Sequence, residues 1–231
     1  MTNIFKLMLA VGSMVASSAR AEIVASGDDC GPNCSWSFDD ETKTLMVRGT
    51  GKMYDYTTVP EIHINEGREY ESNRPWIAYV SEIEKIDIGE GITSTGKYFC
   101  AHCTKLKDVK LPETLKDLSL DTFWDTSLKE ITVPESVVTI SDEAFLDSSN
   151  LEKVYCSAAQ ATKCAVAIEG SRAGIEPIIY EKYGDAYYID GKFYQNAYDM
   201  TKNNNIKKRI YTVDEARKVS GETNRVTIRY K

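Results

Sequence analysis

The ten residues LKEITVPESV, which begin at Leu128, almost repeat an earlier stretch of the same chain. LKDVKLPETL begins at Leu106, and a more divergent version, IEKIDIGEGI, begins at Ile83. A fourth, partial version begins at Leu151, so the phrase recurs every 22 to 23 residues. A repeat of this length predicts a solenoid, because one unit cannot bury its own apolar side and must stack on its neighbours.

Each unit predicts a short strand, then a turn that starts at Pro112 or Pro134, then a return segment. Alternate residues of a strand lie on the same face, so the apolar positions of the phrase point into the core. We therefore expect one buried column along the stack, made of Ile86, Val109, Ile131 and Val154. Two more columns recur in the return segments, one of Thr95, Leu118 and Ile140 and one of Cys100, Phe123 and Phe145.

The phrase L-x-x-V-x-L-P-x-x-L and the pair Ala144-Phe145 resemble the leucine-rich repeat family, and specifically its BspA-like, or Treponema-type, branch. The preceding segment resembles the N-terminal cap of that branch through Trp36-Ser37-Phe38, TKTLMVRGTGKMYDY from Thr42, Pro75-Trp76 and Tyr79. The resemblance covers Cys30 to Cys156 and implies an exported bacterial surface protein that binds protein or extracellular-matrix ligands without catalysis. Two features depart from the pattern: Cys100 stands where Phe is expected, and the unit that runs from Phe123 to Leu128 is one residue short.

The predicted fold is α+β and β-rich: a short leucine-rich-repeat solenoid with an N-terminal β-hairpin cap and a small C-terminal α+β unit. In the cap, Asp39–Lys43 forms a polar turn between two apolar strands. Near the other end, YYIDGKFY from Tyr187 predicts a hairpin that turns at Asp190-Gly191, and Thr212-Val-Asp-Glu215 opens a short helix that Gly221 closes. The predicted divisions are 1–21 signal peptide, 22–82 N-terminal β cap, 83–179 leucine-rich repeats and 180–231 basic C-terminal unit.

The first 21 residues have the layout of a secretory signal peptide. Lys6 precedes an apolar run from Leu7 to Ala16, and the small residues Ala19 and Ala21 follow it. No later stretch approaches the roughly 20 apolar residues that a membrane-spanning helix needs. We therefore expect a protein that is secreted or held at the cell surface, or periplasmic if the cell has two membranes, with no membrane span.

The charge of the chain is unevenly distributed. The whole sequence carries a net charge of −7, yet residues 202–231 hold nine Lys or Arg against three acids, which is a net of +6. A basic tail on an acidic body either folds back on that body or docks on an anionic polymer of the cell envelope. The acidic body and the export signal disfavour nucleic acid as a partner.

Six cysteines follow the signal peptide, and an even number in an exported chain predicts disulfides, although six cysteines allow 15 pairings. Their clustering favours three local pairs: Cys30 with Cys34, Cys100 with Cys103, and Cys156 with Cys164. The sequence Cys100-Ala-His102-Cys103 also allows a thiol oxidoreductase, but the helix-opening context of such sites is missing. A zinc site of His63 with the first pair is a further alternative, which an export route disfavours. We expect no metal and no cofactor.

Residues between the apolar strand positions should face the concave side of the solenoid. They form one row of Lys85, Asp108, Glu130 and Lys153 and another of Asp87, Lys110, Thr132 and Tyr155. These rows form either a recognition face, as the family resemblance implies, or a solvated ladder of mutually satisfied charges. The flat area of roughly 200 Å² is small beside the roughly 800 Å² that each partner usually contributes to a stable interface.

No hydrolase or phosphate-binding motif accompanies the repeats: G-x-S-x-G, H-E-x-x-H and a glycine-rich phosphate loop are all absent from the sequence. The leading hypothesis is therefore a non-enzymatic binding protein of the cell surface. The alternatives are a structural envelope protein docked through its basic C-terminal unit, and a thiol oxidoreductase that uses Cys100 and Cys103.

Overall fold

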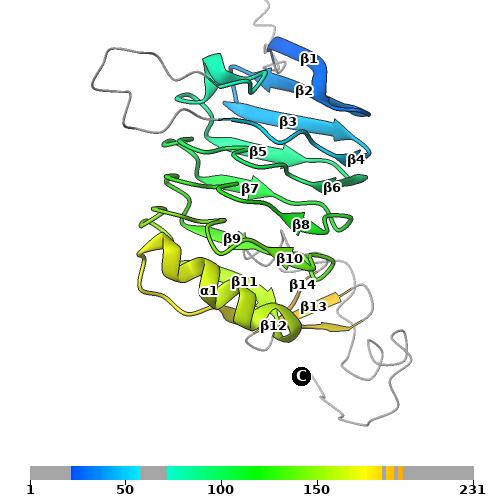
Figure 1. Ribbon diagram of the computed structural model, residues 1–231. Coiled ribbons are helices and arrows are strands. Elements are labelled where there is room, and N and C mark those ends of the chain that lie inside the picture. The colour runs from blue at the N-terminus through cyan, green and yellow to red at the C-terminus, as the bar shows by residue number, and fades with distance from the viewer. Residues whose placement is uncertain (1–21, 58–71, 184–185, 190–191, 195–231) are drawn as a thin grey trace, which may run out of the picture.

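The computed structural model describes residues 22–57, 72–183, 186–189 and 192–194. Coils of the chain stack from β1 at one end to α1 at the other (Figure 1). The predicted signal peptide and the predicted helix at Thr212 lie outside the described residues. The elements in chain order are β1 (Ile23–Gly31), β2 (Cys34–Asp39), β3 (Thr44–Gly49), β4 (Gly51–Lys52), a 3-10 helix (Ile77–Tyr79), β5 (Lys85–Ile88), β6 (Ile92–Ser94), β7 (Asp108–Lys110), β8 (Asp117–Leu118), β9 (Glu130–Thr132), β10 (Thr139–Ile140), β11 (Lys153–Ser157), a second 3-10 helix (Ala158–Gln160), α1 (Ala161–Ser171), β12 (Ile178–Tyr183), β13 (Ala186–Ile189) and β14 (Lys192–Tyr194).

The repeated phrases form the strands of one layer, and the segments after the turns form a second. Strands β5, β7, β9 and β11 lie in one column, while β4, β6, β8 and β10 lie in another (Figure 1). Pairing between coils is parallel and in register, so that Ile86 lies opposite Val109 and Ile131 lies opposite Val154. The predicted leucine-rich-repeat fold is confirmed.

The predicted spine is buried from end to end. Ile86 is 2% exposed, Val109 5%, and both Ile131 and Val154 are fully buried. These residues belong to one continuous apolar core that runs from Cys30 to Ile168. Stacking of the coils therefore removes from water the apolar side that no single coil could bury.

The return segments stack as well. The Phe123 amide donates to the Ala144 carbonyl at 2.9 Å, and the Phe123 and Phe145 rings stack with centroids 6.0 Å apart. One coil earlier, the Cys100 amide donates to the Thr122 carbonyl at 2.9 Å, which places Cys100 in the Phe column. The preceding residue, Phe99, is fully buried, and its ring lies 5.3 Å from the ring of Trp76 between centroids.

An antiparallel hairpin closes the N-terminal end of the stack, as the sequence predicts. Trp36 and Phe38 of β2 pair with Val47 and Leu45 of β3, and β3 then pairs in parallel with β5. The sequence did not predict β1, which adds an outer strand to β2 with register shifts on either side of its middle. The cap thus converts parallel repeat strands into an antiparallel edge.

The strand layer is interrupted between the second and third repeats. Strands β1, β2, β3, β5 and β7 form one sheet, and β9, β11, β12, β13 and β14 form another, in those orders. Strands β7 and β9 are neighbours in space (Figure 1), but among the described strands they belong to different ladders. The shortened unit from Phe123 to Leu128 lies directly before this break.

The C-terminal end is closed by a helix and a hairpin. Helix α1, which the sequence analysis did not predict, packs on β10 and β11 and buries Cys164, Ala167, Ile168 and Ser171. The predicted hairpin forms, since Tyr187 pairs with Tyr194, although its turn at Asp190-Gly191 lies outside the described residues. Neither α1 nor the other helical segments described could cross a membrane.

Candidate binding surface

The side chains between the buried strand positions form a surface that we call the strand face. Lys85 lies opposite Asp108 and Asp87 opposite Lys110, as both rows require. On the other side of the break, Glu130 lies opposite Lys153 and Thr132 opposite Tyr155. The break divides the strand face into an N-terminal half on β2, β3, β5 and β7 and a C-terminal half on β9 and β11.

Most charges on the strand face are paired across neighbouring coils. Asp87 binds the Arg48 guanidinium and lies 3.5 Å from Lys110 Nζ. Lys153 Nζ lies 3.4 Å from Glu130, and this carboxylate raises the pKa of Lys153. A partner must therefore compete with these ion pairs or bind around them, which limits the affinity that any single charge can provide.

Pairs of the same kind flank the strand face. Lys107 Nζ donates to Glu84 at 2.9 Å, and Lys129 Nζ donates to Glu152 at 2.8 Å. Each hydrogen bond lowers the pKa of its carboxylate, Glu84 or Glu152. The ladder of alternating charges expected from the sequence is thus present, and it extends to the edges of the strand layer.

The cap enlarges the N-terminal half beyond the predicted rows. Thr44 of β3 lies opposite Lys85, and Met46 lies opposite Asp87. Arg48 is exposed next to them and donates through Nη1 to the Asp87 carbonyl at 2.6 Å. Sequence reasoning treated the cap as a cover and missed these residues. The alternation around Leu45 and Val47, which matches the repeat strands, was the signal that could have found them.

The C-terminal half is covered by the chain itself. Tyr180, Tyr187, Ile189 and Tyr194 form a second buried group, which we call the tyrosine cluster. Tyr155 packs against this cluster, and Thr132 is only 5% exposed. The structure therefore places these two predicted binding residues in an internal contact, and the six others on partly or fully exposed positions.

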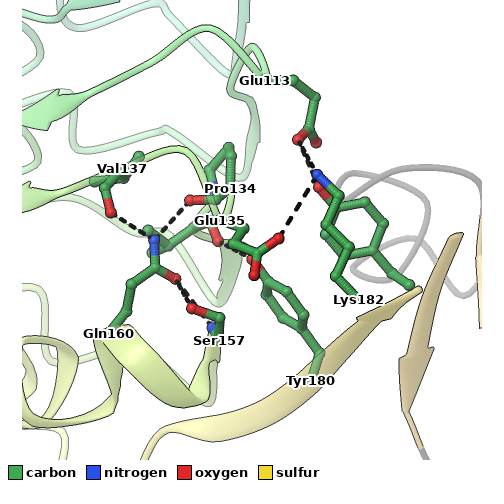
Figure 2. Close-up of polar contacts among 10 residues, drawn as sticks. Glu113, Pro134, Glu135, Val137, Ser157, Gln160, Tyr180 and Lys182 are labelled. Atoms are coloured by element: carbon green, nitrogen blue, oxygen red, sulfur yellow. Dashed lines mark hydrogen bonds and ion pairs between the residues drawn. The ribbon is translucent and has the colours of Figure 1, made fainter. Parts of the chain in front are cut away.

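Polar contacts fasten β12 and β13 to the turns of the second and third repeats. The Tyr187 hydroxyl donates to Glu113 at 2.5 Å, and the Tyr180 hydroxyl donates to the Val133 carbonyl at 2.9 Å. Lys182 Nζ lies 3.5 Å from Glu113 and 3.8 Å from Glu135, so it bridges two coils (Figure 2). Burial raises the pKa of both tyrosines still further above neutral pH, so both hydroxyls are protonated and can donate.

The cysteines form two disulfides, and the third expected pair is unbonded. Cys30 is joined to Cys34 and Cys100 to Cys103, with S–S distances of 2.10 and 1.98 Å. Cys156 and Cys164 are free thiols, both buried, which differs from the three-disulfide expectation.

The bonded cysteines bear on two alternatives raised by the sequence. Cys100 and Cys103 are fully buried, so a substrate thiol cannot reach their sulfurs. Cys30 and Cys34 are bonded to each other and cannot serve as zinc thiolates, and His63 lies outside the described residues. Across the described part of the chain, no three His, Cys, Asp or Glu side chains come together in a way that could hold a metal ion.

One carboxyl group is buried on the side of the return segments. Asp121 is 6% exposed, and its Oδ1 atom has no hydrogen-bond partner. Burial, with help from nearby Glu143, raises the pKa of Asp121 to about 6. The neighbouring imidazole of His102 instead pairs with Asp125, at 2.9 Å from Nδ1 to Oδ2. Such a raised pKa reflects a structural cost here, because the carboxyl group is buried and one of its oxygens has no hydrogen-bond partner.

Comparison with known proteins agrees with this architecture. The sequence pattern of the BspA type Leucine rich repeat region matches residues 53–164 in six copies. This part of the chain therefore belongs to the BspA-type leucine-rich repeat family, and the resemblance read from the repeats is confirmed. No curated protein sequence matches the chain.

Among solved structures, a leucine-rich repeat protein from Eubacterium ventriosum is similar at 18% identity and a TM-score of 0.32, covering 71% of this chain and 48% of its own. A leucine rich cell surface protein from Faecalibacterium prausnitzii is 23% identical with a TM-score of 0.34, covering 50% and 26%. The leucine-rich repeat protein of T. pallidum is 12% identical with a TM-score of 0.32, covering 52% and 67%. The chain thus spans less than half the length of the first two structures.

Proposed function

We propose that this protein is exported and binds a protein or extracellular-matrix ligand at the cell surface, without catalysis, through the N-terminal half of its strand face. The observation that carries the proposal is a difference in exposure between the two halves. Arg48, Lys85 and Lys110 are exposed, whereas in the C-terminal half Thr132 is buried and Tyr155 packs against the tyrosine cluster, while Lys153 remains exposed. Their strands are fixed by the buried columns beneath them. A partner would therefore meet charges at set spacings, with little conformational entropy lost from the backbone on binding.

The size of this surface suggests weak or multivalent binding. Four strands about 4.8 Å apart span roughly 14 Å, and about four residues of each at 3.3 Å run roughly 13 Å. The product, roughly 180 Å², is well below the roughly 800 Å² of a stable interface. A partner would use the flanks of the strand layer as well, or engage several copies of the protein at a surface.

Charge reversal on the strand face tests the proposal. The mature chain, residues 22–231, would be immobilised on a biosensor and exposed to extracellular-matrix proteins and cell-surface extracts. We expect Lys85→Glu/Lys110→Glu to weaken capture roughly tenfold or more, because both changes reverse a charge that the partner would meet on the strand face. The matched control is Lys52→Glu/Lys116→Glu, since these exposed lysines lie at β4 and β8 in the other layer. Equal loss of binding in both variants, with folding intact, would contradict the assignment of the surface.

The basic C-terminal residues offer a second candidate role, as an anchor on an anionic envelope polymer. Residues 202–231 carry a net charge of +6, which is the observation in favour. Deletion of these residues separates the two roles. Release of the protein from the envelope with unchanged ligand capture would support anchoring, whereas retained localisation with unchanged capture would remove that candidate.

A further inference from the structure

Two buried thiols meet where the last helix joins the repeat stack. Cys156 lies in β11 and Cys164 in α1, and both are fully buried. Helix α1 packs on β11, and the two thiols are close enough that each shifts the pKa of the other. The other four cysteines are already joined to partners three or four residues away.

We propose that Cys156 and Cys164 form a third disulfide when the protein folds under oxidising conditions, and that this bond fixes α1 to β11. The inference does not depend on the proposed ligand binding. It follows from the burial of both thiols where α1 packs on β11, and from the position of α1 at the end of the core. An isolated helix of 11 residues is marginal in water, so its attachment must come from contacts with the stack.

The reaction is thiol–disulfide exchange with a small disulfide oxidant such as oxidised glutathione. The thiolate of Cys156 attacks the oxidant, forms a mixed disulfide and releases one glutathione thiol. The thiolate of Cys164 then attacks the Cys156 sulfur and releases the second glutathione. Two protein thiols thereby lose two electrons and two protons, and one glutathione disulfide is reduced to two thiols.

Access sets the order of events. Both sulfurs are fully buried once α1 is packed, so an oxidant reaches them only before α1 docks or while it is transiently detached. The bond would then trap the packed arrangement, because it removes separated positions of α1 and β11 from the accessible ensemble.

Tryptic mapping without reductant tests the bond directly. Trypsin cleaves after Lys153, Lys163 and Arg172, which places Cys156 in the peptide VYCSAAQATK and Cys164 in CAVAIEGSR. The other two pairs each lie within a single tryptic peptide, so a linked pair of peptides is diagnostic. The full mature chain would be refolded with reduced and oxidised glutathione, alkylated in denaturant and digested. We expect VYCSAAQATK linked to CAVAIEGSR, and the link should vanish after reduction. Alkylation of both cysteines, or their linkage to any other cysteine, would overturn the proposal.

Hydrogen exchange tests the second part of the proposal. In the oxidised protein we expect amides of α1 to open roughly tenfold less often than in the same protein after reduction. The double variant Cys156→Ala/Cys164→Ala controls for the other two disulfides, since reductant should leave its α1 protection unchanged. An equal effect of reductant on α1 in the variant and in the natural sequence would show that the bond does not fix the helix.

Discussion

The two halves of the strand layer are built from the same repeated phrase, yet they end in opposite ways. The N-terminal half continues into an antiparallel hairpin and leaves Arg48, Lys85 and Lys110 exposed. The C-terminal half continues into β12 and β13, which bring the tyrosine cluster against Tyr155, and Thr132 of this half is buried. A repeat therefore specifies the stacking of the chain, whereas the segments that flank the repeats decide which part of its surface remains available.

The break between β7 and β9 separates the halves in only one layer. The return segments stay linked, because the Cys100 amide reaches the Thr122 carbonyl and the Phe123 amide reaches the Ala144 carbonyl. The apolar core also passes through the level of the break. We therefore expect the two halves to unfold as one cooperative unit despite the interrupted ladder.

The largest expected loss of stability comes from two substitutions that each create a cavity in the core, one on either side of the break. Ile86→Ala and Ile131→Ala should each lower the free energy of unfolding by about 3 kcal/mol, because both side chains are buried in the same column. Urea unfolding followed by circular dichroism and tryptophan fluorescence would measure the loss. Coincident transitions in both variants are expected, while Val138→Ala, at a site that is 60% exposed, should change stability by less than about 0.5 kcal/mol. A separate transition for one half would show that the break divides the molecule.

The buried carboxyl of Asp121 gives the next largest effect. Its pKa is raised from 3.8 to about 6, so the folded protein holds a proton that the unfolded chain releases between these values. Stability contributed by this group is therefore present below about pH 4 and lost as the pH rises to about 6. We expect Asp121→Asn to stabilise the protein by about 1–2 kcal/mol at pH 7 and much less at pH 4, measured by urea unfolding at both values.

Asp125, four residues after Asp121, provides a matched control for this substitution. Asp125 has the same positive backbone φ of 51° as Asp121, but its carboxylate is paired with His102. Asn accepts this backbone conformation readily, so neither substitution should add strain. Asp125→Asn should give no stabilisation at pH 7, and an equal gain in both variants would mean that burial of Asp121 is not the cause.

The polar contacts that attach β12 and β13 to the repeats should contribute less to the free energy of unfolding. Tyr187→Phe removes the hydroxyl that donates to Glu113 and should cost about 1 kcal/mol, measured by thermal or urea unfolding. Hydrogen exchange should show faster opening of β13 in the same variant. Tyr54→Phe, at a site that is 49% exposed, serves as the control and should change neither quantity.

The smallest expected change in stability comes from a substitution in the N-terminal half of the strand face. Arg48→Ala breaks the ion pair with Asp87 and should change the free energy of unfolding by less than about 1 kcal/mol, with a smaller effect at high salt. If this half is the binding surface, ligand capture should nevertheless fall. A large loss of stability would instead mean that Arg48 holds the cap in place.

Much of the fold could be read from the sequence because the repeats report it several times. The spacing of Leu106, Val109 and Leu111 recurs in each unit, and each copy independently indicates the same inward face. Helix α1 was missed because it occurs once, within a stretch assigned to the repeats, and its signals are local. Ser157 and Gln160 form a capping box on the 3-10 helix that leads into α1, and Gln160 also donates to the carbonyls of Pro134 and Val137 (Figure 2).

The surface was harder to predict than the core. The register of Lys85 with Asp108 follows from the repeat, but the burial of Thr132 depends on a hairpin that starts more than 40 residues later. Nothing local in the third repeat indicates that cover. The contact of Tyr187 with Glu113 joins residues 74 positions apart, and a single sequence carries no periodic signal for such a pair.

The shifted register of β1 has a consequence for contacts between molecules. A regular outer strand offers evenly spaced amide and carbonyl groups, onto which another chain can add as a further strand. In β1 that spacing is disturbed on both sides of Gly27, and Asp28 and Asp29 place negative charge at the same level. As the outermost described strand at this end of the stack, β1 is therefore a poor template for the growth of fibres from one copy of the protein to the next.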